Sequence, residues 1–349
     1  MQLNDFLNHT SEWLKDTGPH SDIVISSRIR LARNLDKFSF PHWANKKQSG
    51  EALEIIERAL ADIESLKKAA FFRLSDLDSI DKQLLVERHL MSLEHARKTD
   101  HKAVIVDEEE KISVMINEED HLRIQYMQSG FNLLGAWNSI NKIDDSLSNA
   151  LNFAFSVDWG YLTACPTNTG TGMRGSVMLH LPALVMAGQI NRVLAAIAKL
   201  SFTTRGLYGE GTQASGNFFQ ISNQVSLGHS EGEIIEDINA IINQIISQER
   251  QAREAMLTKS RATLEDRINR SLGILKSAHI ITSQETIELL SMARLGCDLG
   301  MIKEFNRRTV NELFITIQPA HLQRLENKKL SAEERDVKRA ELIKSKLTA

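Results

Sequence analysis

The sequence is poor in cysteine and lacks the patterns that bind structural zinc. It has 2 cysteines among 349 residues, Cys165 and Cys297. They lie far apart, and neither forms a CxxC pair or a Cys/His pair with metal-ligand spacing. A disulfide framework and a zinc module are therefore excluded as the basis of the fold.

Long apolar runs and an excess of one charge are also absent. No stretch of about 18 apolar residues occurs, so we expect no membrane span. The first 16 residues are polar and amphipathic, without the basic region or the apolar core of a signal peptide. Because 42 basic side chains nearly balance 45 acidic ones, we expect no general attraction to nucleic acid or to a membrane. These features indicate a cytoplasmic protein.

The best-known nucleotide-binding motifs are missing or incomplete. The chain has no GxxxxGK[ST] loop and neither the HRD nor the DFG motif of eukaryotic-type protein kinases. Gly170, Gly172 and Gly175 satisfy GxGxxG, but the acidic residue that a dinucleotide-binding fold requires about 20 positions later is lacking. We interpret these glycines as points where a loop backbone approaches phosphate closely, beside Arg174.

What the chain does contain is a set of arginines in short, dense blocks. The blocks are SSRIRLAR (26–33), NEEDHLR (117–123), CPTNTGTGMRG (165–175) and RGLYGEGTQASGN (205–217), and their arginines of interest are Arg28, Arg30, Arg123, Arg174 and Arg205. Each block alone would also fit a solvated strand or loop. Together in one cleft they would bind a polyanion such as a nucleoside triphosphate, because each guanidinium offers a planar fork of donors. Arg33 would lie on the opposite face of an extended segment, so we leave it out.

Two glutamates and a thiol accompany the arginines. Glu118 and Glu119 would repel each other unless a cationic substrate or a neighbouring arginine offsets the repulsion between their carboxylates. Glu119 and Glu210 could then hold a guanidinium, which suggests phosphoryl transfer from the polyphosphate onto arginine. Cys165 precedes a proline and the glycine-rich loop. A free cysteine is most often buried and inert, but several arginines nearby would favour its thiolate.

Hydrophobic periodicity predicts strands before residue 250 and mostly helices after it. We expect helices over 3–16, 50–69, 80–96 (which contains His89), 131–150, 177–200, 230–255, 250–278, 284–295, 305–315 and 332–347. We expect strands over 22–26, 102–107, 111–117, from 121 onward and over 218–228.

Taken together, these blocks resemble the phosphagen kinases, the ATP:guanido phosphotransferase family. The resemblance covers nearly the whole chain, and also includes VERHLMS, RGSVMLHLPAL and LEDRINRSLGIL in the family's order. It implies an α+β fold in which a mostly antiparallel sheet is flanked by helices. The implied parts are an N-terminal helical segment (1–21), a catalytic domain (22–255) and an all-α C-terminal domain (256–349).

The resemblance also implies roles for individual residues. Glu119 matches the family's catalytic carboxylate, Glu210 its second guanidinium-binding glutamate, and Cys165 its reactive cysteine. The implied ATP-binding residues are Ser26, Ser27, Arg28, Ile29, Arg30, His89, Arg123, Arg174, Gly175, Ser176, Val177, Met178, Arg205, Gly206, Leu207, Tyr208, Gly209 and Glu210. No metal ligand from the protein is implied, and Mg²⁺ would be held mainly through nucleotide phosphates and water.

Two features favour the branch of the family that phosphorylates arginine residues in proteins. Members that act on small molecules carry an all-helical domain before the SSRxR block, which here begins at Ser26. In addition, RDVKRA matches a phosphoarginine-binding regulatory motif through Arg335, Asp336, Arg339 and Ala340, although six such residues also fit a charge pattern on an exposed helix. The alternatives are a kinase of free arginine or a related guanidino compound, and a non-catalytic adaptor that binds phosphoarginine.

The resemblance implies partners as well. These are substrate proteins with accessible arginines, an activator protein, a heat-shock repressor and a Clp ATPase, which together belong to bacterial protein quality control and the stress response. A homodimer or a larger assembly is implied too.

Overall fold

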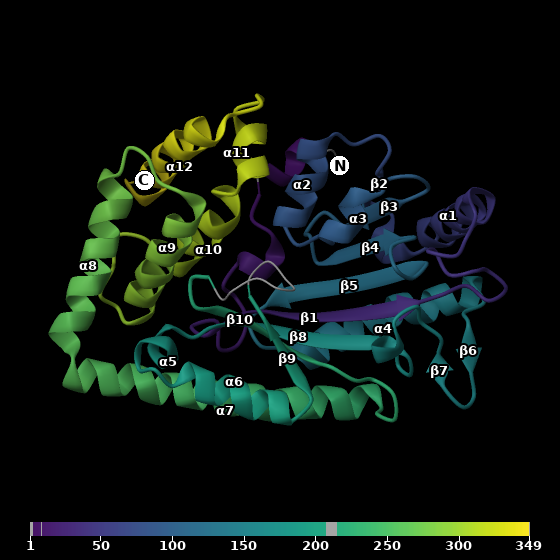
Figure 1. Cartoon of the computed structure of the whole chain (residues 1–349), viewed down its shortest axis with the longest axis horizontal. Coiled ribbons are helices and arrows are strands. Elements are labelled where there is room, and N and C mark those ends of the chain that lie inside the picture. Colours follow the sequence, from purple (N-terminus) through teal and green to yellow (C-terminus); the bar gives the residue numbers. More distant parts are fainter. Residues whose placement is uncertain (1–2, 8, 207–214, 349) are drawn as a thin grey trace.

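The computed structural model describes residues 3–7, 9–206 and 215–348 (Figure 1). Its centre is an eight-stranded sheet with the order β2-β3-β4-β5-β1-β8-β10-β9, in which every neighbouring pair is antiparallel. Its strands are β1 (Val24–Arg33), β2 (Ala70–Arg73), β3 (Ala103–Val106), β4 (Ile112–Ile116), β5 (Leu122–Ser129), β8 (Met173–His180), β9 (Phe202–Arg205) and β10 (Phe218–Asn223). A separate hairpin is formed by β6 (Phe155–Ser156) and β7 (Gly160–Tyr161). The predicted α+β class with a mostly antiparallel sheet is confirmed.

Helices surround the sheet and form the C-terminal part. They are α1 (Lys46–Ala61), α2 (Ser79–Glu87), α3 (Leu93–Arg97), α4 (Leu133–Ala150), α5 (Pro182–Met186), α6 (Ile190–Lys199), α7 (Glu231–Lys259), α8 (Arg261–Ser277), α9 (Ser283–Asp298), α10 (Arg307–Thr316), α11 (Pro319–Leu325) and α12 (Ala332–Thr348). Short 3-10 turns are η1 (Leu3–Leu7), η2 (Glu12–Leu14), η3 (Glu64–Leu66) and η4 (Pro166–Asn168). Among the helices that the structure describes, none is both long and apolar enough to cross a bilayer.

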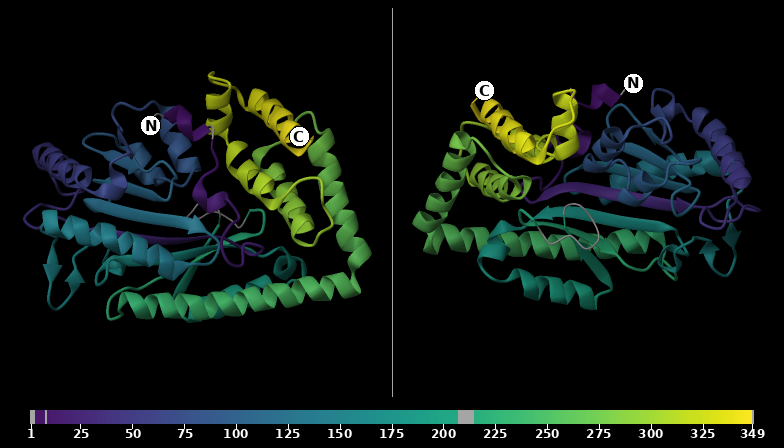
Figure 2. Two further views of the ribbon diagram at one scale, coloured as in Figure 1. Left: turned by 180° about the vertical axis from the view of Figure 1, so that it is seen from behind. Right: turned by 45° about the horizontal axis from the view of Figure 1, so that its top comes forward.

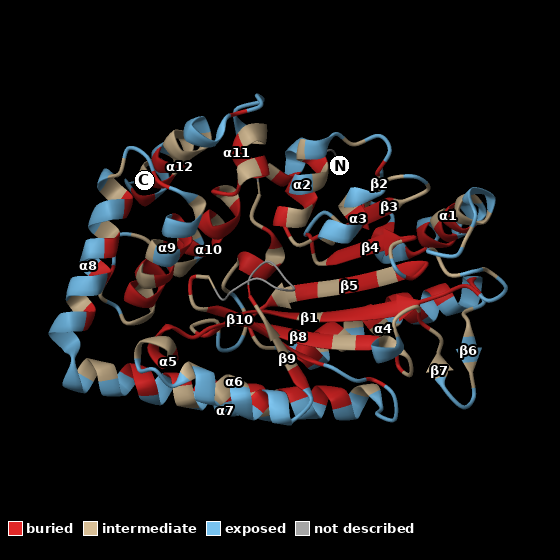
Figure 3. Cartoon of the chain, viewed as in Figure 1, coloured by how far each residue is buried: buried red, intermediate tan, exposed pale blue. Residues whose placement is uncertain are grey.

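The two faces of the sheet differ because successive side chains of a strand point to opposite sides. On β1, Ile29 and Leu31 are fully buried in the apolar core that α1, α4 and α7 cover. Arg28 and Arg30 alternate with them and therefore lie on the other face. Figure 3 shows the central strands buried, whereas the outward surfaces of α7 and α8 are exposed. One face of the sheet thus supplies this core, and part of the other face is left for a site, while Met127 and Met115 on that face belong to two further apolar clusters.

The C-terminal helices pack beside one end of the sheet. Helix α7 runs along the length of the molecule, and α8 turns sharply away from it (Figure 2). The turn falls at Ser260, where φ is −143° and ψ is 30°, so the helix predicted over 250–278 is divided in two. The predicted stripe on this segment is present, since Leu264, Ile268 and Leu275 are buried.

Of three other predicted helices, the one over 3–16 is wrong, whereas α2 and α3 cover most of 80–96 and α5 and α6 form within 177–200. The segment 3–16 forms only the two short turns η1 and η2. The helix over 80–96 is interrupted at His89, whose φ of 60° is incompatible with a right-handed helix. In 177–200 the first residues are strand β8, because a central strand buried by neighbours on both sides is as apolar as a buried helix. In addition, the helix predicted over 50–69 begins earlier and ends at Ala61.

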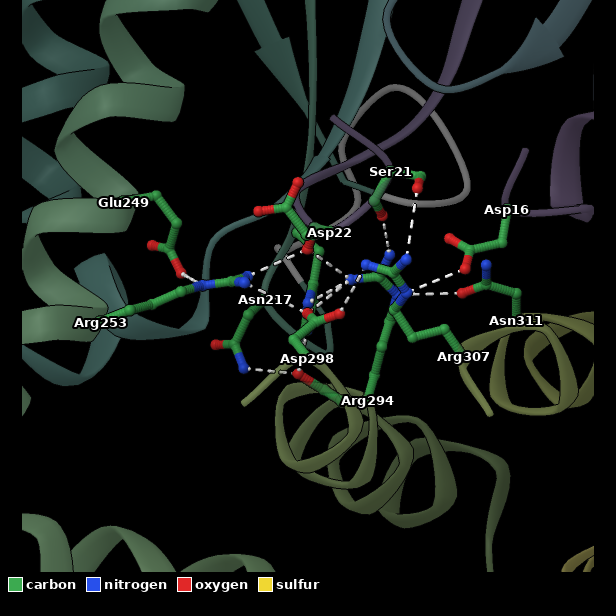
Figure 4. Close-up of polar contacts among 12 residues, drawn as sticks. Asp16, Ser21, Asp22, Asn217, Glu249, Arg253, Arg294, Asp298, Arg307 and Asn311 are labelled. Atoms are coloured by element: carbon green, nitrogen blue, oxygen red, sulfur yellow. Dashed lines mark hydrogen bonds and ion pairs between the residues drawn. The ribbon is translucent and has the colours of Figure 1, made fainter. Parts of the chain in front are cut away.

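A buried ion network joins the C-terminal helices to the rest of the chain (Figure 4). The side chain of Asp298 is fully buried and accepts hydrogen bonds from Arg253 of α7 at 3.2 Å and from Arg294 of α9 at 3.3 Å. Arg307 of α10 reaches the same carboxylate at 3.2 Å and that of Asp16 at 2.8 Å. The Asp298 carboxylate therefore fixes α7, α9 and α10 to one another, and Asp16 attaches the N-terminal segment to them through Arg307.

Candidate active site

A cleft of about 1410 Å³ opens on the polar face of the sheet. Most of the candidate side chains taken from distant parts of the sequence line it. They are Arg28, Arg30, His89, Glu119, Arg123, Cys165, Arg174 and Arg205.

The register of the strands explains how the arginines meet. Arg30 on β1 lies directly opposite Arg174 on β8, and Arg28 lies opposite Ser176. On the outer side, β9 carries Arg205 opposite Gln220 of β10. Strand alternation on neighbouring strands therefore concentrates guanidinium groups on one face.

Arg28 and Arg30, both on β1, make no ion pair with an acidic side chain in the described part of the chain. Arg28 donates to Ser176 Oγ at 3.2 Å and to Gln125 Oε1 at 3.4 Å, both uncharged acceptors. Burial, and then the charges of Arg123 and other arginines, lower the pKa of Arg28 to about 9, so the group stays protonated at neutral pH. Such a self-repelling cluster is suited to binding an anion with several negative charges.

Arg30 is the clearest example of a buried guanidinium in this cluster that lacks a neutralising partner. It is 8% exposed, and its Nε and Nη2 atoms have no hydrogen-bond partner within the described part of the chain. Burial and the surrounding arginines lower its pKa well below the usual value. A buried guanidinium without acceptors carries a large desolvation cost, which phosphate oxygens would offset.

Arg123 is the exception in the cluster because an acid neutralises it. Its Nη1 donates to both carboxylate oxygens of Glu118 at 2.8 Å. Burial alone would raise the pKa of Glu118, but Arg123 and the hydroxyl of Ser92 together lower it to about 2. Of the two ways proposed for relieving the Glu118–Glu119 repulsion, the structure shows the neighbouring arginine.

Glu119 is left exposed to the cleft beside this pair. Desolvation, followed by the charges of Asp120 and Glu118, raises the pKa of Glu119 above its usual value, and Arg123 and His42 act in the opposite direction. A carboxylate with a raised pKa is a better proton acceptor than an ordinary one. The geometry therefore allows Glu119 to act as a base for a group entering the cleft.

Cys165 lies at the start of η4, in the loop that follows the β6–β7 hairpin. Its Sγ is 3.0 Å from Thr167 Oγ1, and the side chain is partly exposed at the cleft. The predicted approach of the glycines in this loop to phosphate stays a prediction, and two of them also have a structural role. Cβ atoms at Gly170 and Gly172 would lie 2.8 Å from Leu227 Cα and 2.6 Å from the carbonyl oxygen of Ala32, so the close approach they allow is to the protein backbone.

His89 is held at the cleft by contacts from two sides. Gln125 Nε2 donates to its carbonyl oxygen at 2.8 Å, and the ring of Trp13 meets its imidazole edge-on at 5.3 Å between centroids. Burial, with a contribution from Arg28, lowers the pKa of His89 to about 3. The imidazole is therefore neutral at physiological pH, and it lies beside the arginine cluster without adding charge.

The other residues expected around ATP fall into three groups. Ser26, Ser176 and Met178 line a small pocket that adjoins the cleft and shares Arg28 and His89 with it. Three residues of the same segments have side chains on the opposite face of the sheet, namely Ser27, Ile29 and Val177, and a Cβ added at Gly175 would point to that face too. Gly206 is buried just after β9. Leu207, Tyr208, Gly209 and Glu210 lie outside the described residues.

The residues of the RDVKRA motif lie on α12, away from the cleft. Arg339 is 1% exposed and donates to the carbonyl oxygens of Ile317 at 3.0 Å and Ile281 at 2.8 Å. It also pairs with Asp336. Arg335 is partly exposed and donates to the carbonyl oxygen of Leu330 at 3.1 Å. Ala340 is buried.

Sequence reasoning missed several polar residues that build the site. Gln125, Thr203, Gln220 and Asp120 line the cleft or support it. The signal for Gln125 was available, since it follows Arg123 by two positions on the same strand and so shares its face. Asp120 gave no such signal, because its partners come from loops distant in the sequence. Over the described residues, no group of three or more His, Cys, Asp or Glu side chains could hold a metal ion.

Comparison with known proteins defines the class. Residues 51–252 match the family model "ATP:guanido phosphotransferase, C-terminal catalytic domain". Among solved structures, lombricine kinase gives a TM-score of 0.61 at 25% identity, covering 73% of this chain and 71% of that one. The duplicated taurocyamine kinase of Schistosoma mansoni gives 0.62 at 26% identity, over 70% of this chain and 35% of that one. The fold is that of a phosphagen kinase, and the chain is an enzyme of the ATP:guanido phosphotransferase type.

The particular family follows from the full-length matches. Residues 261–349 match the model "Protein-arginine kinase McsB C-terminal domain". A protein-arginine kinase of Halothermothrix orenii is 48% identical over 348 residues, which is 99% of both chains. That of Bacillus subtilis is 45% identical, over 99% of this chain and 96% of its own. The chain belongs to the protein-arginine kinase family of ATP:guanido phosphotransferases.

Proposed function

We propose that this enzyme transfers the γ-phosphate of ATP to the guanidinium of arginine residues in proteins, in the cleft that Arg30 and Glu119 line. One observation carries the proposal: the buried Arg30, whose Nε and Nη2 have no acceptor in the described part of the chain, shares a cleft with a carboxylate of raised pKa. The first suits a polyphosphate and the second suits a cationic nucleophile.

The proposed chemistry divides between the two ends of the cleft. Arg28, Arg30, Arg123, Arg174 and Arg205 bind the phosphates and stabilise the charge on the oxygens of the transferred group. A guanidinium is a poor nucleophile because its lone pairs are delocalised and it stays protonated. Glu119 orients the attacking nitrogen and takes its proton as the N–P bond forms and the bond to ADP breaks. Because a carboxylate remains a weak base for this group, alignment supplies much of the acceleration.

Cys165 has a supporting role in this proposal. Its thiol would lie near the guanidinium and help to polarise it, and we expect it to matter less than Glu119. The second guanidinium-binding group remains Glu210, which lies outside the described residues. Mg²⁺ would be held by phosphate oxygens and water, and would offset negative charge on the nucleotide.

The regulatory and cellular proposals follow the family. We infer that Arg335 and its neighbours on α12 bind phosphoarginine and adjust activity, and that the enzyme works in the cytoplasm as a homodimer or larger assembly. Its proposed partners are an activator, a heat-shock repressor and a Clp ATPase that degrades the marked proteins. The partial exposure of Arg335 supports this assignment, because a ligand must be able to reach the binding group. Arg339 is buried and so does not support it in the same way.

The test compares acceptors. The purified enzyme is given ATP with either free arginine or an unfolded protein that contains arginine, and acid-labile phosphate on arginine is measured. Phosphate on the protein alone supports the proposal. Transfer to free arginine with equal efficiency would favour a metabolic guanidino kinase, and no turnover with either acceptor would favour a non-catalytic adaptor.

A further inference from the structure

A buried carboxylate joins the two loops that carry Glu119 and Cys165. Asp120 directly follows Glu119 and is 3% exposed. Its Oδ1 accepts a hydrogen bond from the backbone nitrogen of Ala164 at 2.7 Å, one residue before Cys165. The same oxygen accepts from Asn34 Nδ2 at 2.6 Å. One oxygen atom therefore bonds both to the Cys165 loop and to the end of β1.

Asn34 completes the connection from the other side. It is 1% exposed, and its Nδ2 donates also to the carbonyl oxygen of Leu162 at 3.0 Å. Its Oδ1 accepts from the backbone nitrogen of His121 at 2.9 Å. The side-chain amide thus contacts the chain just after Glu119 and the chain just before Cys165, so it supports the loops in a fixed relation.

The Glu119 carboxylate and the Cys165 thiol make few contacts of their own. The carboxylate of Glu119 makes no hydrogen bond in the described part of the chain, and the bond of Cys165 Sγ is to Thr167 in its own loop. Their separation across the cleft therefore depends on the backbone of each loop. Asp120 and Asn34 bind the backbone of both loops, and within the Cys165 loop Thr163 Oγ1 also donates to the carbonyl oxygen of Cys165 at 2.7 Å.

We propose that Asp120 is a positioning residue that, together with Asn34, sets the distance between the Glu119 carboxylate and the Cys165 thiol around the acceptor guanidinium. This rests on the roles proposed above for Glu119 and Cys165. The charge of Asp120 has a second effect, because after desolvation it is the next cause that raises the pKa of Glu119, with Glu118 acting alongside and Arg123 and His42 opposing.

Two substitutions of Asp120 separate the effect of its hydrogen bonds from the effect of its charge. Asp120→Ala removes the acceptor, so kcat should fall about 100-fold, the size expected when a catalytic group moves by about 1 Å. The KM for ATP should stay within about threefold, since the arginine cluster is untouched. Asp120→Asn keeps an oxygen that can accept both hydrogen bonds, so kcat should recover to within about tenfold of the native value. Loss of the charge should also shift the acidic limb of the kcat/KM profile to lower pH.

A readout independent of phosphotransfer tests the position of the loop directly. In a Cys297→Ser background, the rate of alkylation by iodoacetamide measures the accessibility and reactivity of the Cys165 thiol. Asp120→Ala should change this rate several-fold, whereas Asp120→Asn should leave it near the native value. Asp107→Ala is the matched control, because Asp107 likewise accepts a backbone hydrogen bond, from Ile112 at 2.6 Å, but does not line the cleft. It should change neither kcat nor the alkylation rate.

The outcomes are distinct. An alkylation rate unaffected by Asp120→Ala, or an Asp120→Asn variant as impaired as Asp120→Ala, would overturn the positioning role. So would a loss of activity that matches the loss of thermal stability and appears equally in the Asp107→Ala control. If instead the proposed role of Glu119 is mistaken, Glu119→Gln keeps its turnover, and the alkylation result can still be interpreted.

Discussion

Replacing Arg30 by methionine should stabilise the nucleotide-free enzyme while it weakens the use of ATP. Arg30 is 8% exposed, and its Nε and Nη2 have no acceptor in the described chain. The charges that lower its pKa after burial come from other arginines of the cluster. Methionine fills a similar volume without a charge, so the free protein loses a repulsive centre and the bound nucleotide loses a donor.

The magnitudes follow from the environment of this side chain. An uncompensated buried ion costs several kcal/mol, of which we expect the substitution to recover about 1–3 kcal/mol. At roughly 1.4 °C per kcal/mol for a chain of this length, the melting temperature without nucleotide should rise by about 1–4 °C. A lost charge-assisted hydrogen bond of about 1.5–3 kcal/mol should raise the KM for ATP about 10- to 150-fold. Calorimetry with and without an ATP analogue measures the change in melting temperature, and steady-state kinetics measure the change in the KM for ATP.

Arg33, three residues along the same strand, provides the control. Its guanidinium pairs with Asp144 at 2.7 Å and lies 3.5 Å from the centre of the Tyr161 ring, on the opposite face of the sheet. Arg33→Met should therefore lower stability by about 3–5 kcal/mol, because it leaves a buried carboxylate unpaired, and should leave the KM for ATP unchanged. The reasoning fails if Arg30→Met melts lower than the native protein without nucleotide, or binds ATP normally.

Three further predictions concern other groups. Glu119→Gln should reduce phosphotransfer about 10²- to 10⁴-fold while an ATP analogue still raises the melting temperature; normal turnover would contradict the assignment. Burial raises the pKa of Glu87 from 4.5 to about 7, so the native state holds more protons than the unfolded state between these values, and stability should fall as pH rises through that window. Glu87→Gln should flatten that decline in thermal melts at several pH values, and an unchanged slope would show that another group titrates. Arg335→Ala should blunt activation by phosphoarginine with little change in stability, whereas Arg339→Ala should cost about 1–3 kcal/mol, since it leaves two buried carbonyls without donors. An activation curve unaffected by Arg335→Ala would remove the regulatory role.

The sequence predicts the site better than it predicts the helices. Alternation along 26–33 was enough to place Arg28 and Arg30 on one face and Arg33 on the other, because the period of a strand is fixed by its geometry. The meeting of distant blocks in one cleft could be expected only from the resemblance to a family.

What could not be read from the sequence depends on contacts between distant segments. The left-handed backbone of His89 is held by Gln125 and lies against Trp13, neither of them close to it in the chain. Strand β8 is too apolar to be distinguished from a helix until its two neighbours are known. Asp120 has no pattern of its own, and its function is visible only once Ala164 and Asn34 lie beside it.

The network around Asp298 has a consequence for how the molecule melts. Separating the helices after α7 from the sheet would break the ion pairs of Asp298 with Arg253 and of Asp16 with Arg307 together with the apolar contacts that Ile25, Met127 and Phe218 make with these helices. Partial opening is thus nearly as unfavourable as complete unfolding, so heat should produce one cooperative transition, with calorimetric and van't Hoff enthalpies that agree. A chain cut near residue 255, within α7, would divide Arg253 from Asp298, and neither piece should persist as a folded unit on its own.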